Sequence, residues 1–328
     1  MYFFENTTIY FCLLNFSRTF AYYFNNLTSM EHVNLKGLGT ALITPFQANG
    51  EVDFPALSRL LDYQLQNGVD YLVVLGTTAE TPTISISEQK EITRFVIEKV
   101  NHRVPVVLGC LSGNNTKAVV ERLKTEDLKG VDAILSAVPY YNKPSQEGIY
   151  QHYKAIAQAS PAPVVLYNVP GRTGVNMTAE TTLRLAHDFD KIVAVKEASG
   201  NLAQISTIIK YKPDGFQVVS GDDAITLPLI SIGAVGVISV IGNAFSKEFS
   251  KMVHSALSGD YANALVLHQK FLELYELLFT DGSPAGVKSV LNVMGYIENE
   301  LRLPLVPARV ATYEKIRSVL QEVKGENS

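Results

Sequence analysis

Short apolar runs alternate with longer amphipathic stretches along most of this chain. Eight of these runs hold four or five residues each and are bounded by turn-forming residues, a pattern that predicts buried β-strands. The predicted strands are Thr40–Ile43, Tyr71–Leu75, Val104–Leu108, Ala133–Ala137, Val164–Tyr167, Ile192–Lys196, Phe216–Ser220 and Gly236–Ser239.

The stretches between these runs carry apolar residues with the helical period. Asp53 and Ser87 are the predicted N-caps of the first two helices, and Pro55 suits the first turn of the first helix. Further helices are predicted at Thr116–Leu128, Gln146–Gln158, Ala179–His187, Leu202–Lys210 and Ala224–Ile232. Strands that alternate with helices imply a parallel sheet, and eight such units imply a (β/α)8 TIM barrel with its active site at the C-terminal ends of the strands.

The strand pattern stops after about residue 245. Four helices are predicted beyond it, at Ser246–Ser258, Tyr261–Phe279, Ala285–Val293 and Arg309–Val323. The first of them completes the barrel, and the other three form a C-terminal helical subdomain. The predicted organisation is therefore an N-terminal extension at residues 1–29, a barrel at 30–258 and the subdomain at 259–328.

Residues 1–29 differ in composition from the rest, because they are rich in Phe, Tyr and Asn and carry only the charges of Glu5 and Arg18. We expect this segment to be a disordered or spurious extension ahead of a true start at Met30. A weak secretion or membrane signal is the alternative. Against it, the apolar patch at 9–14 lacks a basic start and a small-residue cleavage site, and it is too short to span a bilayer.

The overall composition narrows the classes of function. The 328 residues are 47% hydrophobic and 18% charged, with a formal net charge of −4, which suits one large folded domain. No basic stripe is visible, so nucleic acid is not an expected partner. The two cysteines, Cys12 and Cys110, lack the spacing of a zinc site. We expect a cytoplasmic protein with neither a metal ion nor a membrane partner.

Lys196 ends a predicted strand, and a small polar turn follows it at residues 197–200. A lysine that is deprived of water favours its neutral amine, which can attack a carbonyl carbon and form a Schiff base. The alternative is a strand-end lysine that reaches solvent or pairs with Glu197.

Other polar residues follow the predicted strands and would gather at the same face of the barrel. Thr77 and Thr78 follow the second strand, where their hydroxyl and N–H groups either hold a small carboxylate or form a turn that caps the next helix. Tyr167 ends the fifth strand, and Arg172 lies on a tight loop after it. A phenol can relay a proton and a guanidinium can clamp a carboxylate, whereas core packing and a surface ion pair are the alternatives.

Distinctive residues also accompany the fourth, seventh and eighth predicted strands. Tyr140 and Tyr141 lie between prolines after the fourth strand, where a phenol relays a proton or fills an interface. The sequence at 220–223 caps the helix after the seventh strand. Gly233 and Gly236 around the eighth strand indicate close strand packing rather than a phosphate site, because no glycine-rich loop leads into a helix there.

Six motifs occur together at these strand ends: GTTAE from Gly76, PYYNKPSQEG from Pro139, YNVPGRTG from Tyr167, VKEASGN from Val195, SGDD from Ser220 and GVISV from Gly236. With them the chain resembles the dihydrodipicolinate synthases, a family of the pyruvate-dependent class I aldolases to which N-acetylneuraminate lyase also belongs. The resemblance runs from about residue 35 to the C-terminal helix. It implies an enzyme that condenses pyruvate with L-aspartate 4-semialdehyde on the diaminopimelate route to lysine.

The resemblance implies that Lys196 forms the Schiff base with pyruvate. It implies that Tyr167 exchanges protons in a relay with Thr77 and Tyr141. In the family this second tyrosine crosses from a neighbouring subunit, so the resemblance also implies a dimer or a tetramer.

The remaining implied roles belong to substrate binding. Thr78 and Ile238 would contact the pyruvate, Gly221 would line the pocket, and Arg172 would hold the carboxylate of the aldehyde. Because the substrate is held covalently on a lysine, the resemblance implies neither a metal nor an organic cofactor.

The sequence departs from the family pattern at a few positions. Ala79 replaces a glycine, which the backbone accepts if φ is negative. Ile86, Gln89 and Ala118 occupy positions where feedback-regulated members place His and Glu side chains around a lysine effector. Such an effector would lose charge-assisted partners here, so we predict weak or absent inhibition by lysine. Strong inhibition by millimolar lysine in an activity assay would contradict this prediction.

Two other functions compete with the synthase. A sibling aldolase or lyase that acts on sugar acids, such as an N-acetylneuraminate lyase, is disfavoured by Arg172 and by the paired Thr77 and Thr78. A non-catalytic barrel that serves as a binding or regulatory protein is disfavoured by the presence of Lys196, Tyr167 and Thr77.

Overall fold

The computed structural model describes residues 33–324, and residues 34–324 belong to one compact unit. The prediction for residues 1–29 lies outside the described part of the chain. The bounds predicted for the barrel and the subdomain stay predictions.

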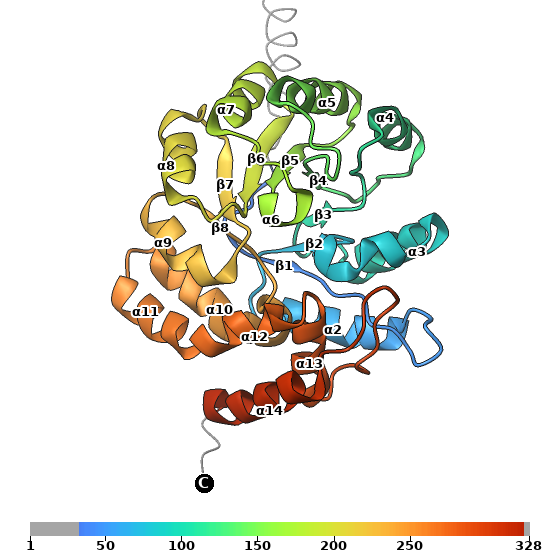
Figure 1. Ribbon diagram of the computed structural model, residues 1–328, viewed down its shortest axis with the longest axis vertical. Coiled ribbons are helices and arrows are strands. Elements are labelled where there is room, and N and C mark those ends of the chain that lie inside the picture. The colour runs from blue at the N-terminus through green and yellow to red at the C-terminus, as the bar shows by residue number, and fades with distance from the viewer. Residues whose placement is uncertain (1–32, 325–328) are drawn as a thin grey trace, which may run out of the picture. The chain divides into compact units, whose positions relative to one another are not determined.

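Eight parallel strands form a closed barrel in sequence order, and the last strand pairs with the first (Figure 1). They are β1 (Gly37–Ala41), β2 (Tyr71–Val74), β3 (Val106–Leu108), β4 (Ala133–Ala137), β5 (Val164–Asn168), β6 (Ile192–Glu197), β7 (Gln217–Ser220) and β8 (Gly236–Ser239). Each overlaps the strand predicted at that place. The predicted fold class, a TIM barrel followed by C-terminal helices, is confirmed.

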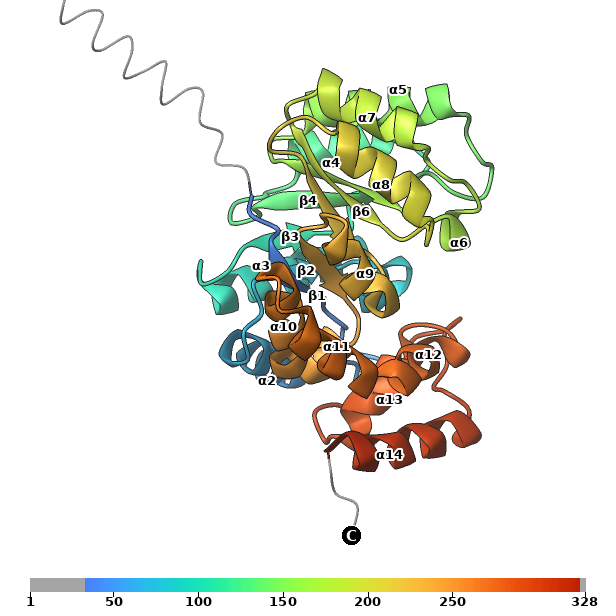
Figure 2. The ribbon, with the colours of Figure 1, turned by 90° about the vertical axis from the view of Figure 1, so that its left-hand side faces the viewer.

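Helices surround the barrel and cover the outer face of the strands (Figures 1 and 2). The barrel helices are α2 (Phe54–Gln66), α3 (Ile86–Val100), α4 (Thr116–Thr125), α5 (Gln146–Ala159), the short α6 (Pro170–Thr173), α7 (Ala179–Asp188), α8 (Leu202–Tyr211), α9 (Thr226–Ser231) and α10 (Gly242–Leu257). The C-terminal helices are α11 (Tyr261–Lys270), α12 (Leu272–Thr280), α13 (Ala285–Val293) and α14 (Val310–Lys324). Because both faces of each strand are covered, the strands are buried along almost their whole length.

One of the two predicted N-caps is correct and the other is wrong. The Asp53 side chain accepts a hydrogen bond from the backbone N–H of Ala56 at the start of α2, as predicted. Helix α3 begins earlier than predicted, because Ser85 and Glu88 form a reciprocal capping box that satisfies two backbone N–H groups. Ser87 therefore lies inside the first turn and does not cap the helix.

The predicted helix at 261–279 is two helices. They meet at Phe271, whose backbone is non-helical and whose side chain is fully buried. Its ring packs against the ring of Phe245, with 5.1 Å between the ring centroids. Phe245 is itself a non-helical kink inside α10, which explains why the periodic pattern of that helix begins only at Ser246.

The predicted helix at 224–232 is also interrupted. A 3-10 turn, η3 (Asp223–Ile225), precedes the short α9. Pro228 in α9 has no backbone N–H to donate to the carbonyl of Ala224, so a regular helix cannot extend back through that turn.

Glycines in β1 and β8 make room inside the barrel. The Tyr71 side chain fills the interior and donates a hydrogen bond from its hydroxyl to the carbonyl of Val237. A Cβ on Gly39 would lie 2.1 Å from the Tyr71 ring, and a Cβ on Gly236 would lie 2.1 Å from the carbonyl oxygen of Gly37. Close packing therefore explains these glycines, as expected for Gly236.

Candidate active site

A cavity of about 1060 Å³ opens at the C-terminal ends of the strands. Loops after β2, β5, β6 and β7 form its floor and inner wall, and α12 forms its outer wall. Six of the eight predicted site residues line this cavity: Thr77, Thr78, Tyr167, Arg172, Lys196 and Gly221. The cavity therefore lies where a TIM barrel carries its active site.

Lys196 and Tyr167 are direct neighbours across β5 and β6. Both side chains are about 6% exposed, and the Lys196 Nζ lies 4.3 Å from the centre of the Tyr167 ring. Gly221 of the next loop leaves room for the lysine, because a Cβ there would lie 3.0 Å from the Cε of Lys196. A mostly desolvated amine thus meets a phenol ring at the cavity floor.

Glu197 follows Lys196 but belongs to a different network. It is fully buried, and it accepts hydrogen bonds from the Asn168 amide and the Ser199 hydroxyl. Burial raises the pKa of its carboxyl. Because Glu197 points away from the cavity, it does not pair with Lys196. Instead its bond to Asn168 joins the ends of the two strands that carry Lys196 and Tyr167.

Thr77 and Thr78 form a tight turn after β2. This 3-10 turn, η1 (Thr77–Ala79), ends at Glu80, which has a left-handed backbone with φ of 61°. Ala79 has no positive φ, so the condition under which alanine can replace glycine there is met. Thr78 is buried, whereas Thr77 is exposed to the cavity.

Arg172 lies on α6, directly after β5. Its guanidinium is exposed and lines the cavity. Pro170 begins the short helix, and Gly174 ends it with a φ of 74°. A rigid turn therefore presents the cation to the cavity, and no carboxylate in the described residues forms an ion pair with it.

Two predicted site residues lie outside the cavity lining. Tyr141 is 89% exposed on the loop after β4, where it has a φ of 67° and donates its N–H to the carbonyl of Thr173. Its phenol does not reach the cavity of its own chain. Ile238 is buried within β8, beside Gly39 of β1.

A buried carboxylate missed by the sequence reasoning lies at the edge of the cavity. Asp223 accepts hydrogen bonds from the backbone N–H groups of Val240 and Ile241, so it fixes the loop after β8. Burial raises the pKa of its carboxyl to about 6. The SGDD motif contained this residue, but the motif by itself suggested only a helix cap.

A narrower hollow of about 460 Å³ adjoins the cavity and reaches Gln89 and Arg122. The Gln89 amide donates to the carbonyl of Ile84 and accepts from Arg122, so its polar atoms are engaged. Ile86 is 55% exposed. The predicted weak response to lysine stays a prediction.

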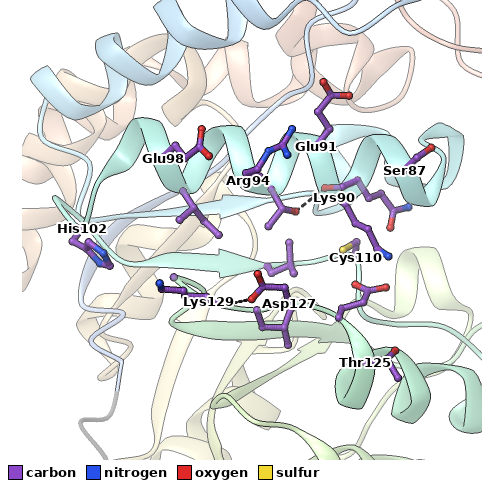
Figure 3. A pocket seen from close by; sticks show the side chains of 17 residues that line it. Ser87, Lys90, Glu91, Arg94, Glu98, His102, Cys110, Thr125, Asp127 and Lys129 are labelled. Atoms are coloured by element: carbon purple, nitrogen blue, oxygen red, sulfur yellow. Dashed lines mark hydrogen bonds between the residues drawn. The ribbon is translucent and has the colours of Figure 1, made fainter.

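A separate hollow of about 750 Å³ lies on the flank of the barrel, between α3 and the segment at 125–130 (Figure 3). Acidic and basic side chains alternate around it, including Lys90, Glu91 and Arg94. At its floor, burial raises the pKa of the Cys110 thiol to about 11, which keeps the thiol protonated and unreactive. None of the eight predicted site residues lines this flank hollow.

Comparison with known proteins identifies the family of this chain. The Dihydrodipicolinate synthetase family matches residues 34–323 of this chain. The chain belongs to this family. It is 67% identical over 295 residues to the 4-hydroxy-tetrahydrodipicolinate synthase of Phocaeicola vulgatus, covering 90% of this chain and 99% of that protein. The expected family and enzyme class, a lyase of the class I aldolase type, are confirmed.

Solved structures of the family share the fold closely. The dihydrodipicolinate synthase of Thermotoga maritima superimposes with a TM-score of 0.86 at 42% identity, covering 88% of this chain and 98% of that one. A structure described as a monomeric dihydrodipicolinate synthase variant gives a TM-score of 0.85 at 42% identity, covering 88% and 97%. The shared fold covers nearly the whole of the barrel and the C-terminal helices.

Two other kinds of feature are absent from residues 33–324. No cluster of three or more His, Cys, Asp or Glu side chains in this part of the chain could hold a metal ion. Among the helices described there, none has the length and apolar character needed to cross a membrane.

Proposed function

We propose that this protein is a 4-hydroxy-tetrahydrodipicolinate synthase that condenses pyruvate with L-aspartate 4-semialdehyde. The observation that carries the proposal is the pairing of Lys196 with Tyr167 on the floor of the cavity, 4.3 Å from amine to ring centre. This reaction requires a desolvated amine beside a proton donor, next to space for two small substrates. The cavity of about 1060 Å³ provides that space.

The reaction begins with the Lys196 amine attacking the C2 carbonyl of pyruvate. Loss of water leaves an iminium, which draws electrons and allows a methyl proton to leave, giving an enamine. The enamine carbon attacks the aldehyde carbon of the second substrate, and the aldehyde oxygen takes up a proton. The amino group of that substrate then attacks C2 and displaces Lys196 as the ring closes.

Hydroxyl groups move the protons between these steps. We assign the donor and acceptor role to Tyr167, whose ring already contacts Lys196. Thr77 lies on the same cavity wall and continues the relay. Tyr141 completes the relay in the cavity of a second copy of the chain, since its phenol does not reach the cavity of its own chain.

Substrate binding is assigned to the remaining residues. The buried Thr78 turn receives the pyruvate carboxylate, with Gly221 leaving space beside Lys196. Ile238 supports this pocket from β8. Arg172 holds the carboxylate of the aldehyde through two parallel hydrogen bonds. The proposed chemistry uses no metal ion and no organic cofactor, and we assign the enzyme to the cytoplasm without nucleic-acid or membrane partners.

Replacing Arg172 by alanine should raise the KM for L-aspartate semialdehyde roughly 10- to 100-fold, the worth of a hydrogen-bonded charge pair. The KM for pyruvate should change little, because pyruvate binds at Lys196. Steady-state kinetics with each substrate varied in turn checks this. The control is Arg184→Ala, since Arg184 is paired with Glu147 on the outside of the barrel. An unchanged semialdehyde KM would contradict the assigned role and favour a sugar-acid aldolase.

The shared relay predicts that activity depends on association. Tyr140 and Tyr141 expose 50% and 89% of their surface, as expected for residues that a second subunit covers. Specific activity should fall on dilution in step with dissociation of the dimer or tetramer, measured by analytical ultracentrifugation. Tyr141→Phe should lower kcat without changing the assembly. A fully active monomer at assay dilution would contradict the shared relay, and the solved monomeric variant makes this outcome a real alternative.

The proposed function is tested by pyruvate-dependent consumption of L-aspartate semialdehyde. Turnover with this aldehyde, and none with N-acetylneuraminate, supports the synthase. Turnover of the sugar acid alone would favour the sibling lyase. If borohydride traps no pyruvate on the protein and no turnover occurs, the barrel is a binding protein.

A further inference from the structure

A buried ion pair links the threonine turn to the C-terminal helices. Glu80, the residue that ends the turn of Thr77 and Thr78, pairs with Lys288 of α13 at 2.5 Å. Both side chains are fully buried. These residues are far apart in the sequence, and the reaction proposed above assigns neither of them a role.

The surrounding contacts hold both partners in place. Lys288 donates a hydrogen bond to the carbonyl of Glu300 and lies 4.3 Å from the centre of the Phe46 ring. The second oxygen of Glu80 accepts the backbone N–H of Arg302. Burial lowers the pKa of Lys288 to about 8, and the charge of Glu80 opposes that shift.

A second ion pair closes the same network. The Arg302 guanidinium contacts Glu88 of α3 and donates to the carbonyl of Thr83, just beyond the turn. It also lies 4.4 Å from the Phe46 ring. The pKa of the Glu88 carboxyl is lowered to about 2, mainly by its bond to Arg302. The two acidic side chains, Glu80 and Glu88, and the two basic side chains, Lys288 and Arg302, therefore lie in one cluster and match in number.

Glu80 and Lys288 are each connected through the backbone to residues that line the cavity. On one side the left-handed backbone of Glu80 donates its N–H to the carbonyl of Thr77, which lines the cavity. On the other side, the segment leading into α13 places Thr280 and Ser283 in the opposite wall. A strained backbone of this kind persists only where the surroundings hold it.

Resting on the proposed function, we propose that Glu80 and Lys288 are positioning residues, whose ion pair sets the Thr77 hydroxyl at its place in the proton relay and holds the C-terminal wall against it. The pair acts through Thr77 and touches no substrate. A buried pair is a poor source of net stability, because its desolvation offsets most of its attraction. Its value here lies in fixing geometry, since a shift of about 1 Å in a reacting group costs up to roughly 100-fold in rate.

The test uses Glu80→Gln, Lys288→Met and the double variant that carries both changes. The single variants leave one charge buried without a partner and should be less stable than the parent. The double variant removes both charges and should recover most of that stability. Its kcat should nevertheless stay about 10- to 100-fold below the parent value, as expected for a displaced relay group. Its KM for pyruvate should remain within about threefold of the parent value.

Two readouts separate positioning from a general loss of folded enzyme. Borohydride trapping of pyruvate on Lys196 should reach the parent level in the double variant, because Schiff-base formation needs Lys196 rather than the C-terminal wall. The stability control is Leu185→Ala in α7, a fully buried residue remote from the cavity, which should lower the melting temperature but leave kcat near the parent value.

The proposal is overturned if the double variant turns over within twofold of the parent. It is also overturned if trapping and turnover fall together, or if the double variant is unfolded at the assay temperature, since the pair would then serve folding. Failure of the parent protein to trap pyruvate would instead refute the proposed function. The two failures are therefore distinguishable.

Discussion

Lys196→Ala lowers pyruvate-dependent turnover by roughly four orders of magnitude or more, as expected when a covalent nucleophile is removed. The methyl group that remains cannot form a Schiff base, and no other lysine lines the cavity among the described residues. The variant should still fold, because the change shortens a side chain beside a cavity. The measurement is semialdehyde consumption together with mass spectrometry after borohydride treatment, which should find no pyruvate adduct.

Two matched variants sharpen this experiment. Lys196→Arg keeps the positive charge but presents a guanidinium that does not lose its proton, so it should be as inactive as the alanine variant. Lys247→Ala removes an exposed lysine from α10 and should retain full activity. A pyruvate adduct on the Lys196→Ala protein would show that the nucleophile lies elsewhere.

Tyr167→Phe should lower kcat by roughly 100- to 10,000-fold, the range expected when a positioned proton donor is lost. The substitution keeps the ring that lies 4.3 Å from the Lys196 amine and removes only the hydroxyl. Packing and stability should therefore stay close to those of the parent. Steady-state kinetics with both substrates at saturation measures the effect, and thermal unfolding confirms that the fold is intact.

The control for this variant is Tyr211→Phe, which removes a hydroxyl from a 56% exposed ring on α8. It should have no effect on turnover. With Tyr167→Phe, the pyruvate adduct should still form on long incubation, because the lysine amine is intact. A kcat within twofold of the parent value would contradict the relay assigned to Tyr167.

The effect expected for Lys196→Ala differs in kind from the effect predicted for loss of the Glu80–Lys288 pair. Loss of Lys196 removes the adduct and turnover together, whereas loss of the pair is expected to lower kcat and spare the adduct. Tyr167→Phe should resemble the pair variants in this respect but with a larger effect, since it removes a group of the relay rather than displacing one.

Local patterns in the sequence were sufficient for the strands of the barrel. Buried parallel strands are short apolar runs bounded by turns, so every predicted strand overlaps an observed one. The cap at Asp53 followed from a bond within three residues. The cap at Ser87 was wrong because the reciprocal bonds between Ser85 and Glu88 start the helix earlier in the chain.

The break in the helix predicted at 261–279 depended on a more distant contact. The periodic pattern at 261–279 runs through Phe271 without interruption, yet the helix ends there because that ring packs into the core against Phe245. The sequence cannot reveal this, since neither residue is unfavourable in a helix by itself.

The sequence by itself determined the barrel, the family, and the strand ends that carry Lys196, Tyr167, Thr77 and Arg172, because strand ends and motifs are local properties of the chain. Only the tertiary structure decided which of these residues meet. The register of β5 and β6 places Tyr167 beside Lys196, while the loop after β4 leaves Tyr141 outside the cavity of its own chain. The Glu80–Lys288 pair likewise exists only after folding, because residues distant in sequence become neighbours when the C-terminal helices pack against the mouth of the barrel.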